Sequence, residues 1–72
     1  VVKDEKLFFR VVKFAFAQRR KTLLNALKGG GVPTEEASCM LKTSGIDGSR
    51  RGETLSLQEF ASIADSWYEL IH

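Results

Sequence analysis

Three consecutive cations, Arg19, Arg20 and Lys21, are the residues whose types and spacing most clearly suggest chemistry. Fully ionised side chains are not buried without partners, so the triplet must lie at the surface. Arginine and lysine are the side chains that proteins use to bind phosphate oxygens. We therefore predict that this run contacts an anionic partner.

The apolar pattern on either side of the triplet indicates a bend. A helical stripe ends at Phe16, and its continuation would place Arg19 in the core, where an unpaired charge is costly. Its members are Phe8, Val11, Val12, Ala15 and Phe16. Leu23, Leu24 and Leu27 define a second stripe, rotated by roughly a quarter turn. We expect two helices joined near Ala17 and Gln18, with the triplet in the first turn of the second. Cations are unfavourable at that end of a helix, which points to a functional role.

The charges divide unevenly between the two parts of the chain. Residues 1–28 contain eight Lys and Arg against two acidic residues, a net charge of +6. Residues 29–72 contain three against seven, a net charge of −4. Such asymmetry is typical of a protein that binds nucleic acid or another acidic surface through its basic part. A solvated helix face is the alternative that charge alone leaves open.

Length and composition exclude several classes of function. Seventy-two residues form one domain at most, and a single Cys allows no internal disulfide. One Cys and one His cannot supply a zinc site, so we expect no metal. No apolar run approaches the roughly 20 residues of a membrane span, and we expect a cytoplasmic protein. The first residue is not Met, which favours a domain cut from a longer protein.

Four helices and no strand are expected. The first covers about residues 4–16, the second about 18–28, and the third begins at Pro33 and Thr34 and ends at Gly45. The run Gly29-Gly30-Gly31 lacks a preceding strand and a following Gly-Lys-Ser/Thr, so we interpret it as a linker and not a phosphate loop. Ser56-Leu57-Gln58-Glu59 is a capping box that begins the fourth helix, with Leu55 and Phe60 as its hydrophobic staple.

The last helix carries one continuous apolar face, which must cover the other three. Its members are Leu57, Phe60, Ala61, Ala64, Trp67, Tyr68 and Ile71. This spacing favours the core over base stacking for Trp67 and Tyr68. Met40 and Cys39 are expected in the core or at its boundary. The fold class predicted is all-α, a small four-helix orthogonal bundle.

Three segments in a fixed order match a known family. They are Phe16-Ala-Gln-Arg-Arg-Lys-Thr-Leu-Leu-Asn25, Gly45-Ile46-Asp47, and Arg51-Gly-Glu53-Thr-Leu55-Ser56-Leu57-Gln-Glu-Phe60. Together they closely resemble the C-terminal helical domain of the KsgA-type (RsmA) ribosomal RNA adenine dimethyltransferases, from about Leu7 to Ala64. The resemblance implies a parent enzyme that transfers methyl groups from S-adenosylmethionine to N6 of two adjacent adenosines near the 3′ end of small-subunit rRNA.

The family's catalytic motifs are absent from this sequence. Its catalytic domain carries a glycine-rich loop after a strand and an Asn-(Ile/Leu/Pro)-Pro-(Tyr/Phe) motif, whereas the single proline here, Pro33, is flanked by Val32 and Thr34. A base methyltransferase needs a cofactor pocket and a slot for the flipped base. We therefore expect residues 1–72 to be a single rRNA-docking domain without catalytic activity or a bound cofactor, with S-adenosylmethionine bound elsewhere in the parent.

The resemblance and the basic run together predict the RNA-binding residues. The set is Arg10, Lys13, Gln18, Arg19, Arg20, Lys21 and Arg51. One arginine can instead be structural, held by Glu53 beside Arg51 or by a helix C-terminus. The partners implied are small-subunit rRNA, the pre-ribosomal particle and the N-terminal catalytic domain of the same protein, with a monomer expected and no membrane contact.

Two other interpretations stay open. The chain could be the corresponding domain of an Erm-type methyltransferase, which acts on large-subunit rRNA, although the Gln-Arg-Arg-Lys-Thr-Leu and Arg-x-Glu-Thr-Leu-Ser segments argue against it. It could also be a free-standing helical interaction module such as a helix-turn-helix DNA binder. The glycine run and the acidic last helix disfavour that reading, since no helix presents a clear base-reading face.

Overall fold

The first helix, α1, covers Glu5–Ala17 in the computed structural model, which describes residues 2–18 and 20–71. The Asp4 carboxylate caps it by accepting hydrogen bonds from the backbone N–H groups of Lys6 (2.9 Å) and Leu7 (3.4 Å). Its buried residues are Leu7, Val11 and Ala15, one helical turn apart. The buried face of α1 therefore differs from the predicted apolar stripe, and Phe16, a member of that stripe, is 52% exposed. Leu7 occupies the core because the buried line follows the i, i+4 row.

The second helix, α2, covers Leu23–Gly29 and begins five residues later than predicted. Thr22 is its N-cap, accepting from the backbone N–H of Asn25 at 3.4 Å. The N–H groups of Leu23 and Leu24 donate to the backbone carbonyls of Arg50 (2.6 Å) and Gly48 (3.1 Å), which belong to a distant loop. These bonds replace the extra helical turn, so Arg20 and Lys21 precede the helix and are not part of its first turn. Arg19 lies outside the described residues.

The third helix, α3, covers Thr34–Ser44, as the sequence indicated. Gly45 ends it in the left-handed conformation (φ 74°), which favours glycine. Met40 is buried with Ala37 and Leu41, but Cys39 is exposed, so its predicted place in the core or at its boundary is wrong. Cys39 is two residues from Ala37, about 200° around the helix, and this turns its side chain to solvent.

The fourth helix, α4, covers Leu57–Ile71 and follows a short 3₁₀ turn, η1 (Gly52–Thr54). The capping box is confirmed: Glu59 N–H donates to Ser56 Oγ (3.2 Å), and Ser56 N–H donates to Glu59 Oε1 (2.9 Å). The two ends of the predicted apolar face are exposed, with Leu57 at 73% and Ile71 at 48%. Ile63, which the predicted face omitted, is fully buried in the middle of the helix.

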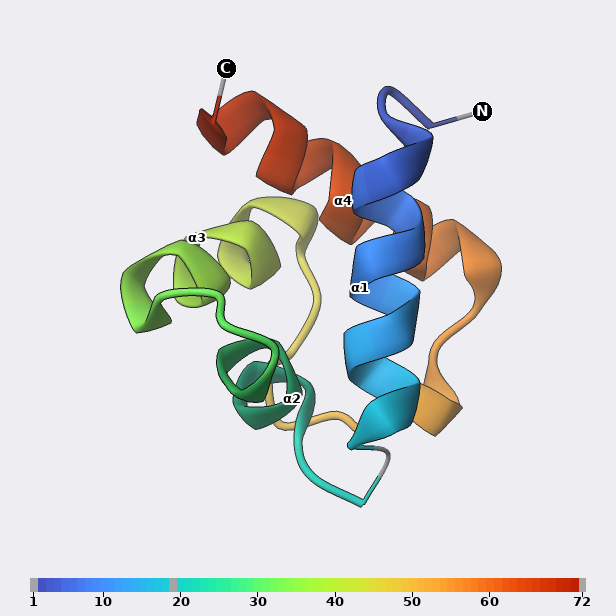
Figure 1. Cartoon of the computed structure of the whole chain (residues 1–72), viewed down its shortest axis with the longest axis vertical. Coiled ribbons are helices and arrows are strands. Elements are labelled where there is room, and N and C mark those ends of the chain that lie inside the picture. The colour runs from blue at the N-terminus through green and yellow to red at the C-terminus, as the bar shows by residue number, and fades with distance from the viewer. Residues whose placement is uncertain (1, 19, 72) are drawn as a thin grey trace.

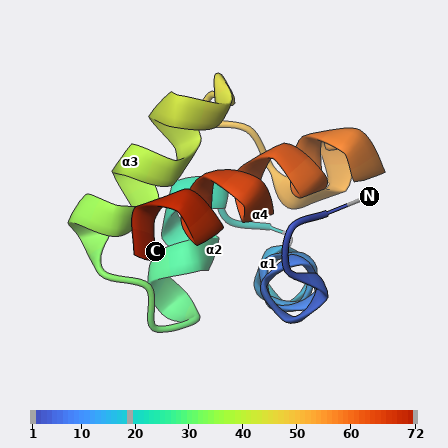
Figure 2. The same ribbon diagram turned by 90° about the horizontal axis from the view of Figure 1, so that it is seen from above.

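The four helices pack as an all-α bundle around one core, as predicted. Figure 1 shows α1 along the long axis of the molecule, with α4 crossing behind it, α3 to its left, and α2 near the end where α1 finishes. Viewed from above, α4 crosses α1, which is seen end-on (Figure 2). All four α-helices contribute to the largest fully buried side chains, which are Phe60, Leu23, Leu27, Met40, Ile63 and Val11. None of the described helices is long and apolar enough to cross a membrane.

Candidate nucleic-acid interface

The bend between α1 and α2 exposes the described part of the basic run. Arg20 and Lys21 are both exposed, in a turn that follows the last residue of α1. The backbone of this turn is ordered by hydrogen bonds, because Gln18 N–H donates to the Phe14 carbonyl (3.3 Å) and Lys21 N–H donates to the Gln18 carbonyl (2.9 Å). Two adjacent cations are thus presented on a hydrogen-bonded turn and not on a helix.

Arg51 is brought to this turn from thirty residues away in the sequence. Thr22 and Arg51 form an isolated antiparallel bridge, next to the short bond from Leu23 N–H to the Arg50 carbonyl. The following residue, Gly52, is buried, and a Cβ built on it would lie 2.7 Å from Ala15 Cβ in α1. Only glycine permits so close an approach, which holds the exposed Arg51 beside the basic turn.

Gln18 occupies a different position from its neighbours. Its side chain is half-buried and lies over the end of α2, where its Nε2 would be 3.1 Å from a Cβ built on Gly29. The half-buried Gln18 side chain therefore covers the junction of the two helices.

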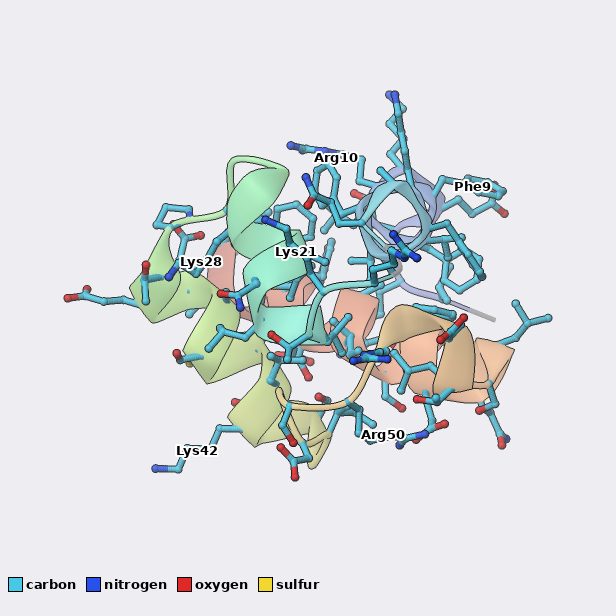
Figure 3. The ribbon with its side chains drawn as sticks, turned by 90° about the horizontal axis from the view of Figure 1, so that it is seen from below. Phe9, Arg10, Lys21, Lys28, Lys42 and Arg50 are labelled. Carbon is cyan, nitrogen blue, oxygen red and sulfur yellow. The ribbon has the colours of Figure 1, made fainter. Side chains whose placement is uncertain are left out.

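Arg10 and Lys13 lie on α1, upstream of the turn. The guanidinium carbon of Arg10 lies 4.9 Å from the centroid of the Trp67 ring and 5.8 Å from that of Phe14. This cation–π stacking fixes the guanidinium against the aromatic core while its edge keeps N–H donors for a ligand. Trp67 itself is buried, as predicted. In Figure 3, Arg10, Lys21 and Lys28 lie in the upper half of the view, and Lys42 and Arg50 lie below them.

Arg50 is the arginine that has a structural role, which sequence reasoning missed. Its guanidinium forms an ion pair with Glu59, donating to both carboxylate oxygens, and also donates to the Thr54 carbonyl (2.7 Å). The bonds from Arg50 to the carboxylate, and then the bond from the N–H of Ser56, lower the pKa of Glu59. The signal was present in the sequence, since a capping-box glutamate has a second oxygen free to bind a cation.

Positive charge near the bend is not neutralised within the described residues. The ion pairs among the described residues are Lys3–Glu69 and Arg50–Glu59. Neither pair involves a residue of the predicted RNA-binding set. Glu53, proposed as a partner of Arg51, forms no ion pair in the described part of the chain. Exposed cations without acidic partners are suited to bind phosphate groups electrostatically, without reading base identity.

The glycine run does not fit a nucleotide cofactor. Gly29 is the last residue of α2 and Gly30 its C-cap, so the backbone N–H groups there are used within the helix end. A Cβ at Gly30 would lie 2.5 Å from the Phe14 ring, so this glycine serves close packing between α1 and the end of α2. The described residues also contain no strand that could precede a phosphate-binding loop.

Comparison with known proteins gives close relatives over nearly the whole chain. Proteins named ribosomal RNA small subunit methyltransferase A match it: 64% identity over 64 residues in Geobacter sulfurreducens, 59% over 70 in Pelotomaculum thermopropionicum, and 52% over 67 in Clostridium acetobutylicum. The matches cover 86%, 94% and 93% of this chain, but only 23–24% of each relative. The chain therefore spans about a quarter of the length of these relatives. No protein-family profile matches it.

Proposed function

We propose that this chain is the rRNA-docking domain of a ribosomal RNA small subunit methyltransferase A. Most of the chain is homologous to part of the proteins with that name, as its sequence motifs indicated. Residues 1–72 act as a single domain. The observation that carries the proposal is the convergence of Arg20, Lys21 and Arg51 at the bend, without an acidic partner among the described residues. We call these three residues the bend cluster.

The bend cluster binds the sugar-phosphate backbone of small-subunit rRNA. The major groove of A-form RNA is too deep and narrow for side chains, so a rigid helical domain binds phosphates and the shape of the fold. Arg10, Lys13 and the edge of Gln18 extend the contact along α1. Arg19 is included in the proposal on its sequence position alone. Such contacts set affinity and register, while base selection belongs to the catalytic domain.

Methyl transfer takes place in another part of the enzyme. A flipped adenosine needs a slot, and S-adenosylmethionine needs a cradle of backbone N–H groups after a strand. The geometry of the glycine run supports the proposal that this chain supplies neither, because Gly29 and Gly30 end α2 and Gly30 packs closely on Phe14. The parent enzyme dimethylates two adjacent adenosines near the 3′ end of the RNA, in the cytoplasm, as a monomer.

Salt dependence of RNA binding tests this function. Each phosphate contact contributes about 0.7–0.9 to the slope of log affinity against log salt concentration. In the intact methyltransferase, Arg20→Gln with Lys21→Gln should reduce that slope by about 1.4–1.8. The matched control is Lys6→Gln with Lys42→Gln, which removes the same charge from exposed positions away from the bend. A double variant at the bend that keeps the wild-type slope would refute the docking function.

A further inference from the structure

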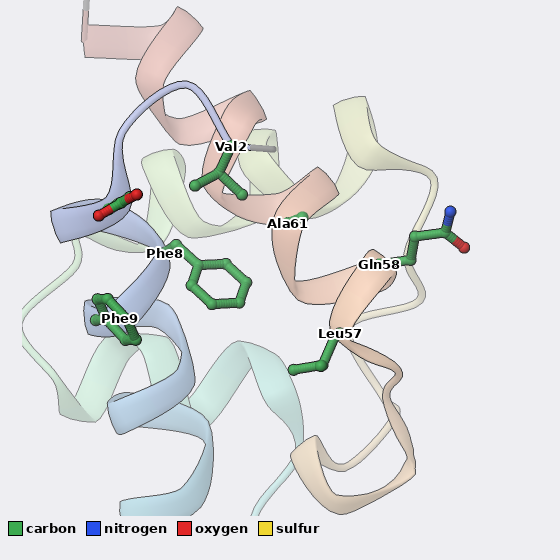
Figure 4. Close-up of a pocket in the computed structure, with 7 residues that line it drawn as sticks. Val2, Phe8, Phe9, Leu57, Gln58 and Ala61 are labelled. Carbon is green, nitrogen blue, oxygen red and sulfur yellow. The ribbon is translucent and has the colours of Figure 1, made fainter.

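An apolar groove lies between α1 and α4, outside the bend cluster. It forms between the first turns of α1 and α4, has a volume of about 490 Å³, and is shown in Figure 4. Its lining residues are Val2, Glu5, Phe8, Phe9, Leu57, Gln58 and Ala61. Phe9 is 64% exposed and Leu57 is 73% exposed, and both border this one groove. Large apolar side chains clustered in this way mark a surface that packs against protein.

The charges around the groove disfavour RNA as its occupant. Its one charged lining residue is Glu5, whose carboxylate would repel phosphates, and no described cation lines it. The bend cluster lies beyond the other end of α1, and Phe9 precedes that end by eight residues, or about 12 Å of helix. An apolar protein surface therefore suits the groove better than a polyanion does.

The chain approaches the groove along a fixed path. Lys3 N–H donates to Asp65 Oδ1 at 2.9 Å, and the Lys3 ammonium forms an ion pair with Glu69, so two bonds tie the segment before α1 to α4. Val2, next to this tie, contributes its side chain to the groove wall (Figure 4). In the proposed enzyme, where the catalytic part is N-terminal to this domain, that part is joined ahead of Val2 and delivered to the groove at high effective concentration.

We infer that the groove is the docking site for the catalytic part of the same polypeptide, which packs an apolar surface against Phe9 and Leu57. This inference rests on the proposed function, in which the chain is one domain of a methyltransferase about four times as long. The groove then sets the angle between the catalytic site and the bend cluster. RNA held at the bend cluster is thereby positioned relative to the chemistry in the catalytic part.

Thiol labelling tests whether the groove is covered. Leu57→Cys and Phe9→Cys variants are prepared as the isolated 72-residue chain and as the intact methyltransferase, then reacted with a maleimide and mapped by mass spectrometry. The native thiol of Cys39 is exposed on α3, outside the groove lining, and serves as the reference within each molecule. The introduced thiols should react at least tenfold more slowly in the intact enzyme, with the Cys39 rate unchanged. Both replaced side chains are exposed, so the variants keep the core intact.

Equal labelling rates in the two forms would overturn the docking of the catalytic part. Protection in the isolated chain that grows with protein concentration would also overturn it, because the groove would then bind a second copy. Methyl transfer to rRNA, measured on the same intact preparations, tests the proposed function separately. An active enzyme with an uncovered groove would refute this inference and leave the proposed function standing.

Discussion

Replacing Gly52 by alanine should destabilise the fold at the contact that positions Arg51. The added Cβ would lie 2.7 Å from Ala15 Cβ and 3.0 Å from the Ala15 carbonyl oxygen. Carbon atoms pack at about 3.5–4.0 Å, so η1 must move by about 1 Å. Ala15 is fully buried in α1 and cannot withdraw. Overpacking of this kind costs about 1–3 kcal/mol. The resulting loss, taken as about 2 kcal/mol, lowers the melting temperature by about 8–16 °C in a domain of this size.

Thermal unfolding followed by circular dichroism measures this effect, with Gly29→Ala as the matched control. A Cβ at Gly29 meets only the Gln18 side chain, at 3.1 Å, and that flexible amide can move aside. Alanine is also a better helix former than glycine, so the control should melt at or above the wild-type temperature. The reasoning fails if Gly52→Ala melts like the wild type, because the contact between η1 and α1 would then tolerate a methyl group.

Three further outcomes are expected. Ser56→Ala should cost about 1 kcal/mol by removing the cap of α4, and an unchanged melting curve would contradict the capping box. The pKa of Glu59 is lowered from the ordinary 4.5, mainly by Arg50 and next by the N–H of Ser56. The stability that these bonds provide is present above about pH 4.5, and it is lost as the pH falls through the lowered pKa. Glu59→Gln should therefore reduce the acid sensitivity of the melting temperature, and equal sensitivity in both proteins would contradict the assignment. Calorimetry should give no heat of binding for S-adenosylmethionine with the isolated chain. A stoichiometric site would refute the proposal that the cofactor binds in another part of the enzyme.

Local sequence signals predicted most of the fold. The capping box at Ser56 and the left-handed Gly45 are decided by hydrogen bonds within a few residues, and both are confirmed. The start of α2 was wrong because it is decided by a distant loop, whose carbonyls at Gly48 and Arg50 accept the N–H groups of Leu23 and Leu24. No periodicity within residues 18–28 carries that information.

The candidate site shows the same division. Exposure of Arg20 and Lys21 follows from their charge, and the sequence predicted it. The bridge between Thr22 and Arg51, and the pairing of Arg50 in place of Arg51 with a carboxylate, depend on how the loop folds back onto α2. Neighbouring arginines have the same side chain, so only the three-dimensional path of the backbone separates the structural one from the exposed one.

Comparing two affinities of one variant tests the central claim most directly. In the intact methyltransferase, Arg20→Gln with Lys21→Gln is measured for binding to small-subunit ribosomal particles and, separately, for binding to S-adenosylmethionine. A docking role in this domain predicts that affinity for the particles falls while affinity for the cofactor stays at the wild-type value. Unchanged affinity for the particles, or an equal loss for both ligands, would show that the bend cluster supports the structure of the enzyme and does not hold its RNA.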